Sequence, residues 1–564
     1  MLWQSIAPPE NTKVEQLSSL LNVPQEIAGL LVQRGITSFE QAKNYFRPAL
    51  NDLHDPFLMQ DMKQAVERIV QAIETKESVM VFGDYDVDGT TAVALVTEYL
   101  KNHIEVVIPY IPDRYKEGYG ISTAGIDQAR AADVSLIIAL DCGIKAHEQI
   151  AYANTRGVDF IICDHHLPDA TLPDAIAVLD PKRTDCPYPY KELCGCGIGF
   201  KLIQALQQYF GLAVTDLDTY LDLVATAIAA DIVPMTGENR ILCHFGIEQI
   251  RKAPRPGLLF FTKNLKKAIQ VSDLVFVIAP RINAAGRMDQ GINAVELLLC
   301  KNQEEALPLA RSIEFFNTER RSTEERITKE ALQQIELDQA QHKSSTVVYH
   351  PSWHKGVIGI VASRLIDKYY RPTVVLTKSD SDLAGSVRSV KGFDVYQALE
   401  QCKDHMIQFG GHKYAAGLTL KEVQLEGFKE AFDQVVESRI LDSQRSPVKL
   451  YDTELTFDKI TPKLYRILAQ MAPFGPKNMK PVFVSHQCID KGGSRLVGSD
   501  KNHLKLELID STGLVMQAIG FGLGEYHIKV KQKRPFSVLY TLDENKFNGI
   551  KSLQLLVKDI QFQV

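Results

Sequence analysis

Three short apolar runs constrain the fold of this chain most strongly, because acidic or imidazole side chains follow each of them. The runs are Val79–Phe82, Leu136–Leu140 and Phe160–Cys163. They are rich in Val, Ile and Leu, as expected of strands that are buried on both faces of a parallel sheet. We therefore expect an α/β fold with helices on both sides of the sheet.

The polar residues that follow these runs predict a metal site. They are Asp84, Asp86, Asp88, Asp141, Asp164, His165 and His166. In an open α/β sheet, ligands bind outside the carboxyl ends of the strands, where these side chains would stand. So many carboxylates would repel one another unless cations lay between them. Carboxylate oxygen with imidazole nitrogen suits a pair of Mn²⁺ or Mg²⁺ ions acting on a phosphate ester, so the sequence predicts a metal-dependent phosphoesterase.

Taken singly, these motifs leave other interpretations open. Asp84, Asp86 and Asp88 also fit a solvated acidic turn or the N-cap of a helix. A calcium loop fits less well, since the Glu expected further along is replaced by the apolar stretch Ala92–Leu95. Asp231 follows a long apolar helical stretch, so it is either a C-terminal helix residue or a bridging ligand. The combination of motifs favours metal binding.

Alternating helical and strand patterns from residue 62 to about 231 predict a doubly wound parallel sheet. A charged region over residues 295–342 predicts a connecting helix, and a second α/β block follows. The last part alternates apolar and polar residues around an Asn548-Gly549 hairpin signal, which predicts a small β-barrel. The expected segments are 1–60 (helical), 61–294 (catalytic), 295–342 (connecting), 343–445 (second α/β) and 446–564 (β-barrel).

The composition indicates which kinds of ligand and which cell compartment suit this protein. The net charge of −6 argues against indiscriminate nucleic-acid binding, although a basic channel in an acidic body is compatible with it. The nine cysteines follow no regular framework, which favours reduced thiols. Neither a membrane-spanning run nor a signal peptide is visible, so we expect a cytoplasmic protein without a membrane partner.

Four ordered motifs resemble those of the DHH phosphoesterase family. They are Gly83–Gly89, Asp141–Gly143, Asp164–His166 and Ile228–Asp231. The resemblance continues through Ala279–Arg287, Trp353–Gly359 and Gly385–Ser389, and Gly410–His412 is similar to the mark of the DHH-associated domain. It covers nearly the whole chain. The expected architecture is therefore a DHH domain, a connecting helix, a DHH-associated domain and an OB-like barrel.

The resemblance implies hydrolysis with two divalent cations, Mn²⁺ or Mg²⁺, as cofactors. The implied metal ligands are Asp84, Asp86, Asp88, Asp141, His165 and Asp231. The implied catalytic residues are His166 and Asp164, with His166 near the scissile phosphate. The sequence leaves open whether His166 acts as a general acid or as an electrostatic stabiliser.

Loop arginines within the matched motifs are candidates for binding phosphate, because guanidinium groups bind it bidentately. The expected substrate-binding residues are Arg114, Tyr119, Arg281, Asn283, Arg287, Ser386, Arg388, Gly410, Gly411 and His412. We expect Ser386 and Arg388 to form a pocket for the 5′ end, closed by Arg114 and Arg281 from the other α/β block. In the barrel, the expected DNA contacts are Lys505, Lys529, Lys531, Lys533, Arg534, Tyr526, Phe536 and Tyr540.

The family members that this chain resembles most degrade single-stranded DNA from the 5′ end, release 5′-mononucleotides, and serve DNA repair and recombination. Single-stranded DNA is thus the expected partner, with a single-strand-binding protein and a helicase as further candidates. Alternatives are an oligoribonuclease or nucleotide phosphatase of the same family, and a non-catalytic replication scaffold with this fold. The additional β-domain disfavours the first two, and the complete set of ligands disfavours the scaffold.

Overall fold

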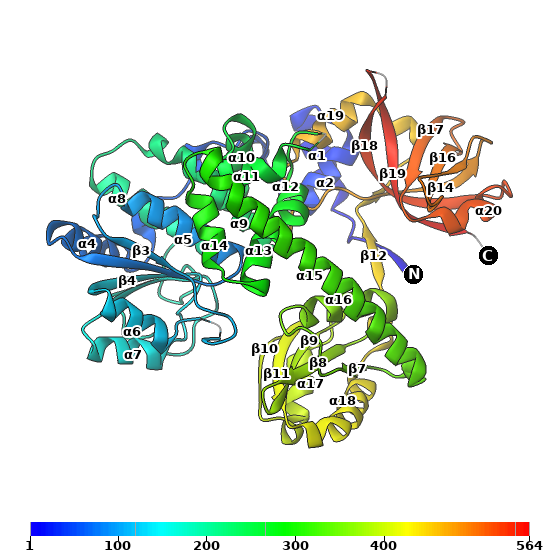
Figure 1. Ribbon diagram of the computed structural model, residues 1–564. Helices are drawn as coiled ribbons and strands as arrows, with labels where there is room; N and C mark the ends of the chain where they lie inside the picture. The colour runs from blue at the N-terminus through cyan, green and yellow to red at the C-terminus, as the bar shows by residue number, and fades with distance from the viewer. Residues whose placement is uncertain (1, 119, 266, 548, 563–564) are drawn as a thin grey trace. The chain divides into compact units, whose positions relative to one another are not determined.

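The computed structural model describes residues 2–118, 120–265, 267–547 and 549–562 (Figure 1). The chain divides into two compact units. The larger unit contains Pro56–Asp231 and Glu248–Pro447, and the smaller one contains Trp3–Asp55, Ile232–Ile247 and the segment from Val448 onward. Among the described residues, none of the helices combines the length and apolar character needed to cross a membrane.

The larger unit begins with a five-stranded sheet in which all neighbours are parallel. In spatial order the strands are β3 (Val107–Tyr110), β2 (Ser78–Gly83), β4 (Val134–Leu140), β5 (Asp159–Cys163) and β6 (Ala177–Leu179). Its helices are α4 (Met62–Glu74), α5 (Val87–Leu100), α6 (Thr123–Ala131), α7 (His147–Thr155) and α8 (Gly195–Tyr209). The predicted doubly wound parallel sheet is confirmed.

Burial of both sheet faces explains the uninterrupted apolar runs. Along each central strand, one set of alternate residues, such as Phe82 and Ile137, packs against Ile126 of α6 and Ile150 of α7. The opposite face is covered by α5, which contacts β2 and β4, and by α8, which contacts β4 and β5. Figure 1 shows α6 and α7 on one side of the sheet and α5 and α8 on the other. A strand between two such layers has no solvent-facing side, so it shows no polar alternation.

Helices join the parallel sheet to the second α/β part. They are α9 (Leu221–Ala230), α10 (Gly237–Lys252), α11 (Pro256–Thr262), α12 (Val271–Asp273), α13 (Ala279–Met288), α14 (Ile292–Leu299) and α15 (Gln303–Leu337), with a π-helical turn over Leu274–Ile278. The expected connecting helix is α15, of 35 residues. It begins later than expected because the Asn302 side chain caps it, accepting from the backbone N–H of Glu305 at 2.9 Å.

The second α/β part is a mixed five-stranded sheet. In spatial order its strands are β10 (Gln408–His412), β11 (Ala415–Leu420), β9 (Asp382–Arg388), β8 (Thr373–Ser379) and β7 (Thr346–Tyr349). Only β7 and β8 are parallel among these neighbours. The accompanying helices are α16 (Ile358–Tyr369), α17 (Val395–Gln401) and α18 (Leu425–Arg439).

The smaller unit contains a closed β-barrel. Its main strands are β14 (Phe483–Asp490), β16 (His503–Ile509), β17 (Val515–Gly520), β18 (Phe536–Phe547) and β19 (Ile550–Phe562). Closure follows because β14 pairs with β18 on one side and with β16 on the other. Five strands closed in this way form an OB-type barrel, as expected. The predicted hairpin joins β18 to β19, and its Asn548 lies outside the described residues.

Helices from the N-terminal region share the core of this barrel. They are α1 (Asn11–Leu21), α2 (Gln25–Gln33) and α3 (Phe39–Phe46). Leu17 and Leu31 belong to the same buried cluster as Phe483 and Tyr540 of the barrel strands. Arg240 reinforces this packing, since its guanidinium donates to the carbonyl oxygens of Tyr45 at 3.0 Å and Met471 at 3.0 Å.

Candidate metal centre

The first acidic motif lies where β2 meets α5. Asp84 follows the strand directly, and Asp86 is the N-cap of α5, where its carboxylate accepts from the backbone N–H of Gly89 at 3.1 Å. Asp88 lies in the first helical turn rather than on the loop. Gly89 is required here, because a Cβ on it would lie 2.3 Å from the Asp84 carbonyl oxygen. The two chain segments can therefore cross only with glycine at this position.

Asp88 lies against the start of α8. Its carboxylate oxygens accept from the backbone N–H groups of Gly195 at 2.6 Å and Cys196 at 2.7 Å. The positive end of the α8 dipole favours the negative charge there. Gly195 also allows close approach, since a Cβ on it would lie 2.5 Å from Cβ of Asp141.

His165 brings the remaining ligands together. Its Nε2 atom lies 3.1 Å from Oδ1 of Asp141, 3.6 Å from Oδ2 of Asp231 and 3.9 Å from Oδ2 of Asp88. Asp141 has a φ of 60°, a left-handed conformation that aspartate adopts more readily than most residues. All six predicted ligands fall within two groups whose potential donor atoms lie within 4.8 Å of one another, namely Asp84, Asp86 and Asp141, and Asp88, His165 and Asp231. A third group of the same kind joins Asp141 and His165 with His166.

The electrostatics of this cluster are those of a cation site. Burial, and then the neighbouring Asp86, raise the pKa of Asp84 to about 8. Burial, and then Asp88, raise the pKa of Asp231 to about 8. Oδ1 of Asp84, Oδ2 of Asp231 and Nδ1 of His165 are buried and make no hydrogen bond within the described part of the chain. Desolvated carboxylates with unused lone pairs match the requirements of divalent cations.

Asp164 is engaged with its own loop and with His166. Its carboxylate accepts from Nδ1 of His166 at 2.7 Å and from the backbone N–H groups of His165 at 2.7 Å and Ile144 at 2.9 Å. Although burial raises the pKa of Asp164, the His166 ring and these donors hold it at about 2. Burial lowers the pKa of His166, but the bond to Asp164 raises it above the ordinary value overall. The carboxylate is 1% exposed, so it orients the imidazole rather than facing a substrate.

Four arginines lie near one another beside this centre. Arg114 packs over the Tyr85 ring at 4.6 Å, and Arg388 donates to Oγ of Ser386 at 3.2 Å. Burial, and then Arg114, Arg388 and Arg320, lower the pKa of Arg287 to about 10. Burial and Arg114 lower the pKa of Arg388 as well. Guanidinium groups that depress one another's pKa form a site for an anion such as phosphate.

Arg281 also lies near this cluster, since it lowers the pKa of Arg320 together with burial, but its own charge is paired. Its guanidinium forms an ion pair with Glu314 at 2.5 and 3.1 Å and donates to the Val277 carbonyl oxygen at 2.6 Å. Arg320 belongs to the cluster of guanidinium groups, and sequence reasoning did not predict this. The available signal was periodicity, since Arg320 shares the buried face of α15 with Ile313, Asn317 and Ile327, where a charged residue is unusual.

A cavity of about 220 Å³ adjoins the arginines. It is lined by Ala230, Val275, Ala279, Pro280, Asn283, Arg287, Arg320 and Ile360. Asn283 and Arg287 thus line the same cavity. Gly410, Gly411 and His412 lie on the exposed edge strand β10, where Gly411 has a φ of 144°. Tyr119 lies outside the described residues.

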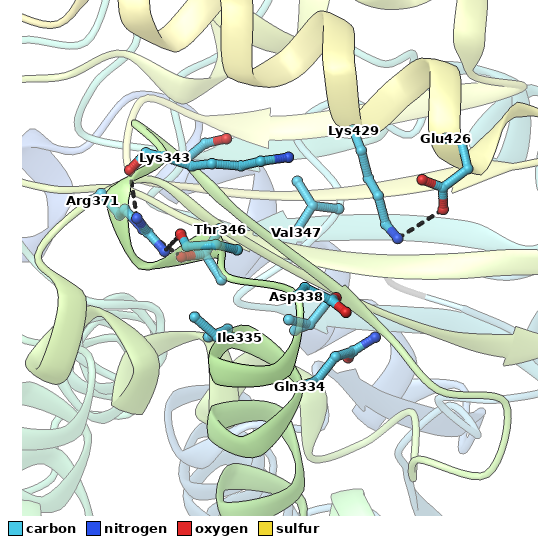
Figure 2. Close-up of a pocket in the computed structure, with 12 residues that line it drawn as sticks. Gln334, Ile335, Asp338, Lys343, Thr346, Val347, Arg371, Glu426 and Lys429 are labelled. Atoms are coloured by element: carbon cyan, nitrogen blue, oxygen red, sulfur yellow. Dashed lines mark hydrogen bonds and ion pairs between the residues drawn. The ribbon is translucent and has the colours of Figure 1, made fainter.

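A larger cavity, of about 410 Å³, lies in the second α/β part between the end of α15, β7 and α18 (Figure 2). Three of its charged residues, Arg371, Lys429 and Glu426, are engaged with neighbouring groups. Arg371 donates to the carbonyl oxygens of Ala340 at 2.9 Å and Gln341 at 3.0 Å, and Lys429 pairs with Glu426 at 2.8 Å. The residues that line it include none of the predicted ligands, so the larger cavity is not the chemical centre.

Comparison with known proteins agrees with this geometry. Family models match the chain over residues 78–228 (DHH family, N-terminal domain), 342–438 (DHHA1 domain) and 451–559 (RecJ OB domain). The single-stranded-DNA-specific exonuclease RecJ of Bacillus subtilis (strain 168) is 35% identical, over 99% of this chain and 70% of that protein. The protein of the same name from Dickeya dadantii (strain 3937) is 34% identical over 96% of each chain.

Solved structures show the same likeness. The crystal structure of RecJ in complex with Mn²⁺ from Thermus thermophilus matches with a TM-score of 0.85 at 26% identity, covering 100% of this chain and 80% of that chain. Fold, site and domain models together define a DHH-type phosphoesterase. Within that class, the chain belongs to the RecJ family, because relatives above 30% identity align over nearly its whole length. The expected family and fold class are confirmed.

Proposed function

We propose that this protein is a single-stranded-DNA-specific exonuclease that hydrolyses phosphodiester bonds from the 5′ end, releases 5′-mononucleotides, and acts in DNA repair and recombination. The observation that carries the proposal is the convergence of six ligands, with unpartnered buried atoms, beside a group of arginines. RecJ of Bacillus subtilis and of Dickeya dadantii are named for this substrate.

Two divalent cations, Mn²⁺ or Mg²⁺, are the proposed cofactors. Asp84, Asp86 and Asp141 would hold one cation, and Asp88, His165 and Asp231 the other. When bound, such a pair lowers the pKa of the attacking water and neutralises charge on the phosphate. RecJ of Thermus thermophilus has been crystallised with Mn²⁺ and with Mg²⁺.

His166 is the proposed proton-handling group. Asp164 has a pKa of about 2 and is therefore ionised, so Nδ1 of His166 must carry the hydrogen of the bond between them. Nε2 is then the atom able to exchange a proton with the substrate. We assign Asp164 a positioning role instead of direct catalysis, because its carboxylate is buried and occupied by donors of its own loop.

The 5′ polarity is proposed to arise at Ser386 and Arg388. Both lie on β9 at alternate positions, so their side chains share a face of the sheet, and the hydrogen bond between them shows this. Arg114 and Arg287 add positive charge there. A terminal phosphate carries more charge than a diester and presents three free oxygens, so such donors distinguish an end from an internal position.

The barrel is proposed to hold the strand rather than cut it. Two expected contacts need correction, because Phe536 and Tyr540 are fully buried in the barrel core. Phe521 is 62% exposed and packs edge-on against His503, so it replaces them as the stacking candidate. Lys505 lies on the same strand as His503. Lys531 is partly occupied, since it donates to the Gly492 carbonyl oxygen at 2.9 Å.

We also propose partners, a cellular location and domain limits for this protein. A single-strand-binding protein and a helicase are proposed partners, since both handle the same substrate. A cytoplasmic location is supported by the nine cysteines, all of which are free thiols. For domain limits, we propose residues 61–294 for the catalytic domain, 343–445 for the DHH-associated domain and 446–564 for the barrel.

The test uses the purified full-length chain with Mn²⁺ and four labelled substrates: single-stranded DNA labelled at either end, duplex DNA, and single-stranded RNA. The expected result is immediate release of a labelled mononucleotide from 5′-labelled single strands, with 3′ label released last. Faster hydrolysis of RNA would favour the oligoribonuclease alternative. Binding without hydrolysis would favour a scaffold.

A further inference from the structure

One motif, Trp353–Gly359, has no part in the chemistry described so far. It forms the loop between β7 and α16 and the first turn of that helix. Trp353 anchors the loop, because it is buried and its indole N–H donates to Glu330 of α15 at 2.8 Å. Two glycines in this motif, Gly356 and Gly359, are each packed against a different group of residues.

Gly356 is packed against the loop that follows β3 and against the end of α13. A Cβ on Gly356 would lie 2.4 Å from Oη of Tyr115 and 2.7 Å from the carbonyl oxygen of Arg287. The Tyr115 hydroxyl donates to that carbonyl oxygen at 2.5 Å, and Nη1 of Arg287 donates to the Gly356 carbonyl oxygen at 3.1 Å. The His354 ring packs edge-on against Tyr115 at 6.2 Å. Three separate segments are thus joined at one point.

Gly359 is packed against Ser386 and Arg388. A Cβ there would lie 2.8 Å from Oγ of Ser386 and 3.0 Å from Nη2 of Arg388. Any side chain at this position would push the two donors away from the start of α16. The glycine therefore determines how closely Arg388 and Ser386 approach the helix.

The two glycines together restrict the positions of arginine side chains that repel one another. Arg114 directly precedes Tyr115, so docking of Tyr115 on Gly356 restricts the backbone from which Arg114 extends. Arg114, Arg287 and Arg388 carry like charges and repel one another, which adds to the effect of burial in lowering the pKa values of Arg287 and Arg388. Groups that repel one another stay close only if surrounding contacts hold them, and the motif at 354–359 supplies such contacts on both sides.

We propose that Tyr115, docked on Gly356, is a positioning residue that holds Arg114 at the separation from Arg388 that a terminal phosphate requires. The docking contact thereby sets the selectivity for a phosphorylated 5′ end. This inference rests on the proposed function. The predicted metal ligands come from other segments, at the ends of β2, β4, β5 and α9, so the contact should affect binding of the end more than the chemical step.

The test substitution is Tyr115→Phe, which removes one hydroxyl and keeps the ring against His354. KM and kcat are measured with Mn²⁺ on single-stranded DNA bearing a 5′-phosphate or a 5′-hydroxyl. We expect KM for the phosphorylated strand to rise about three- to tenfold, the range for one lost hydrogen bond. The kcat values, and KM for the hydroxyl strand, should change less than twofold. Gly356→Ala should act in the same direction and more strongly.

Tyr209→Phe is the matched control, since Tyr209 is exposed at the end of α8, and it should leave all four parameters unchanged. Retention of the full phosphate preference by Tyr115→Phe would overturn the inference, and so would an equal loss on both substrates. A wild-type enzyme without any preference would instead overturn the end-sensing part of the proposed function, and this inference with it. Tyr115→Phe gives the decisive answer even if Gly356→Ala fails to fold.

Discussion

Nδ1 of His166 lies 2.7 Å from Oδ1 of Asp164, and the same carboxylate oxygen accepts the backbone N–H of His165, the neighbouring residue. One buried aspartate therefore orients two consecutive histidines with different proposed tasks. His165 faces Asp141, Asp231 and Asp88, whereas His166 is held in the tautomer with a hydrogen on Nδ1. The adjacency of the histidines in sequence thus allows one carboxylate to contact both residues.

Replacing Asp164 with Asn tests this relationship. The amide keeps the shape but removes the charge that raises the pKa of His166, so the imidazole should lose its proton at lower pH. We expect kcat to fall about 10- to 100-fold and the alkaline limb of the pH–rate profile to move to lower pH. An unchanged profile measured between pH 6 and 9 would show that Asp164 does not act through His166.

Replacing Asp86 or His165 with Ala should abolish turnover in saturating Mn²⁺, because each variant lacks one ligand of the cation pair. Stability without metal should be equal or slightly higher, since removing Asp86 relieves repulsion of Asp84. Thermal unfolding and single-strand hydrolysis are the measurements, and Asp404→Ala, at an exposed aspartate, is the control. Wild-type turnover in either variant would exclude that residue as an essential ligand.

The raised pKa values of Asp84 and Asp231, both about 8, predict a pH dependence of the metal-free protein. Between the ordinary carboxyl pKa of about 4 and about 8, the folded state binds more protons than the unfolded state. The free energy of unfolding contributed by these groups is therefore fully present below pH 4 and is lost as the pH rises to 8. In urea titrations with a chelator, Asp231→Asn should flatten this decline, and for the wild type so should Mn²⁺ added in place of the chelator. A steeper decline in the variant would contradict the assignment.

Arg388→Lys and Arg388→Ala test the 5′ pocket. The Arg388→Lys variant keeps the charge but lacks the planar guanidinium that bonds to Ser386, so its activity should be impaired. The activity of Arg388→Ala should be lower still. The measurement is the rate ratio between 5′-phosphorylated and 5′-hydroxyl strands. The ratio should shrink in the order wild type, Lys, Ala. Equal losses on both strands would make Arg388 a general backbone contact.

The barrel's role is tested at Phe521, which is exposed and apolar. Phe521→Ala should weaken binding to long single strands about tenfold, within the range for one lost stacking contact, and should shorten each processive run. Hydrolysis of very short substrates should persist. Val423→Ala, at another exposed apolar residue in the other unit, is the control. Unchanged processivity on long DNA would rule the role out.

Deleting the barrel is a poorer test, because its core also contains Leu17 and Leu31 of the N-terminal helices.

Much of the fold, and the convergence of the proposed metal ligands, followed from the sequence for a definite reason. Strands buried on both faces carry long apolar runs, and the carboxyl ends of parallel strands meet at one edge, so Asp84, Asp141 and His165 had to converge. Asp231 was less certain by itself, because a helix C-terminus carries no comparable geometric constraint. The resemblance of its motif to a known family supplied what spacing could not.

Some residues have surroundings that the sequence could not show, because they depend on packing between distant segments. Arg281 and Arg287 look alike in sequence, yet Arg281 is neutralised by Glu314 on α15. Phe536 and Tyr540 fit an exposed or an inward face of their strand equally well, and barrel closure decides for the inward face. Alternation along a strand defines two faces but does not show which of them is exposed to solvent.

The barrel core that Leu17 shares with Tyr540 also has a consequence for synthesis on the ribosome. Helices α1 to α3 emerge well before the strands they pack on, which lie beyond the segment that ends at Pro447. At a synthesis rate of roughly 5–20 residues per second, the apolar faces of these helices stay unpacked for on the order of tens of seconds. We expect nascent chains stalled near residue 440 to bind chaperones through this N-terminal region, and full-length chains to release them.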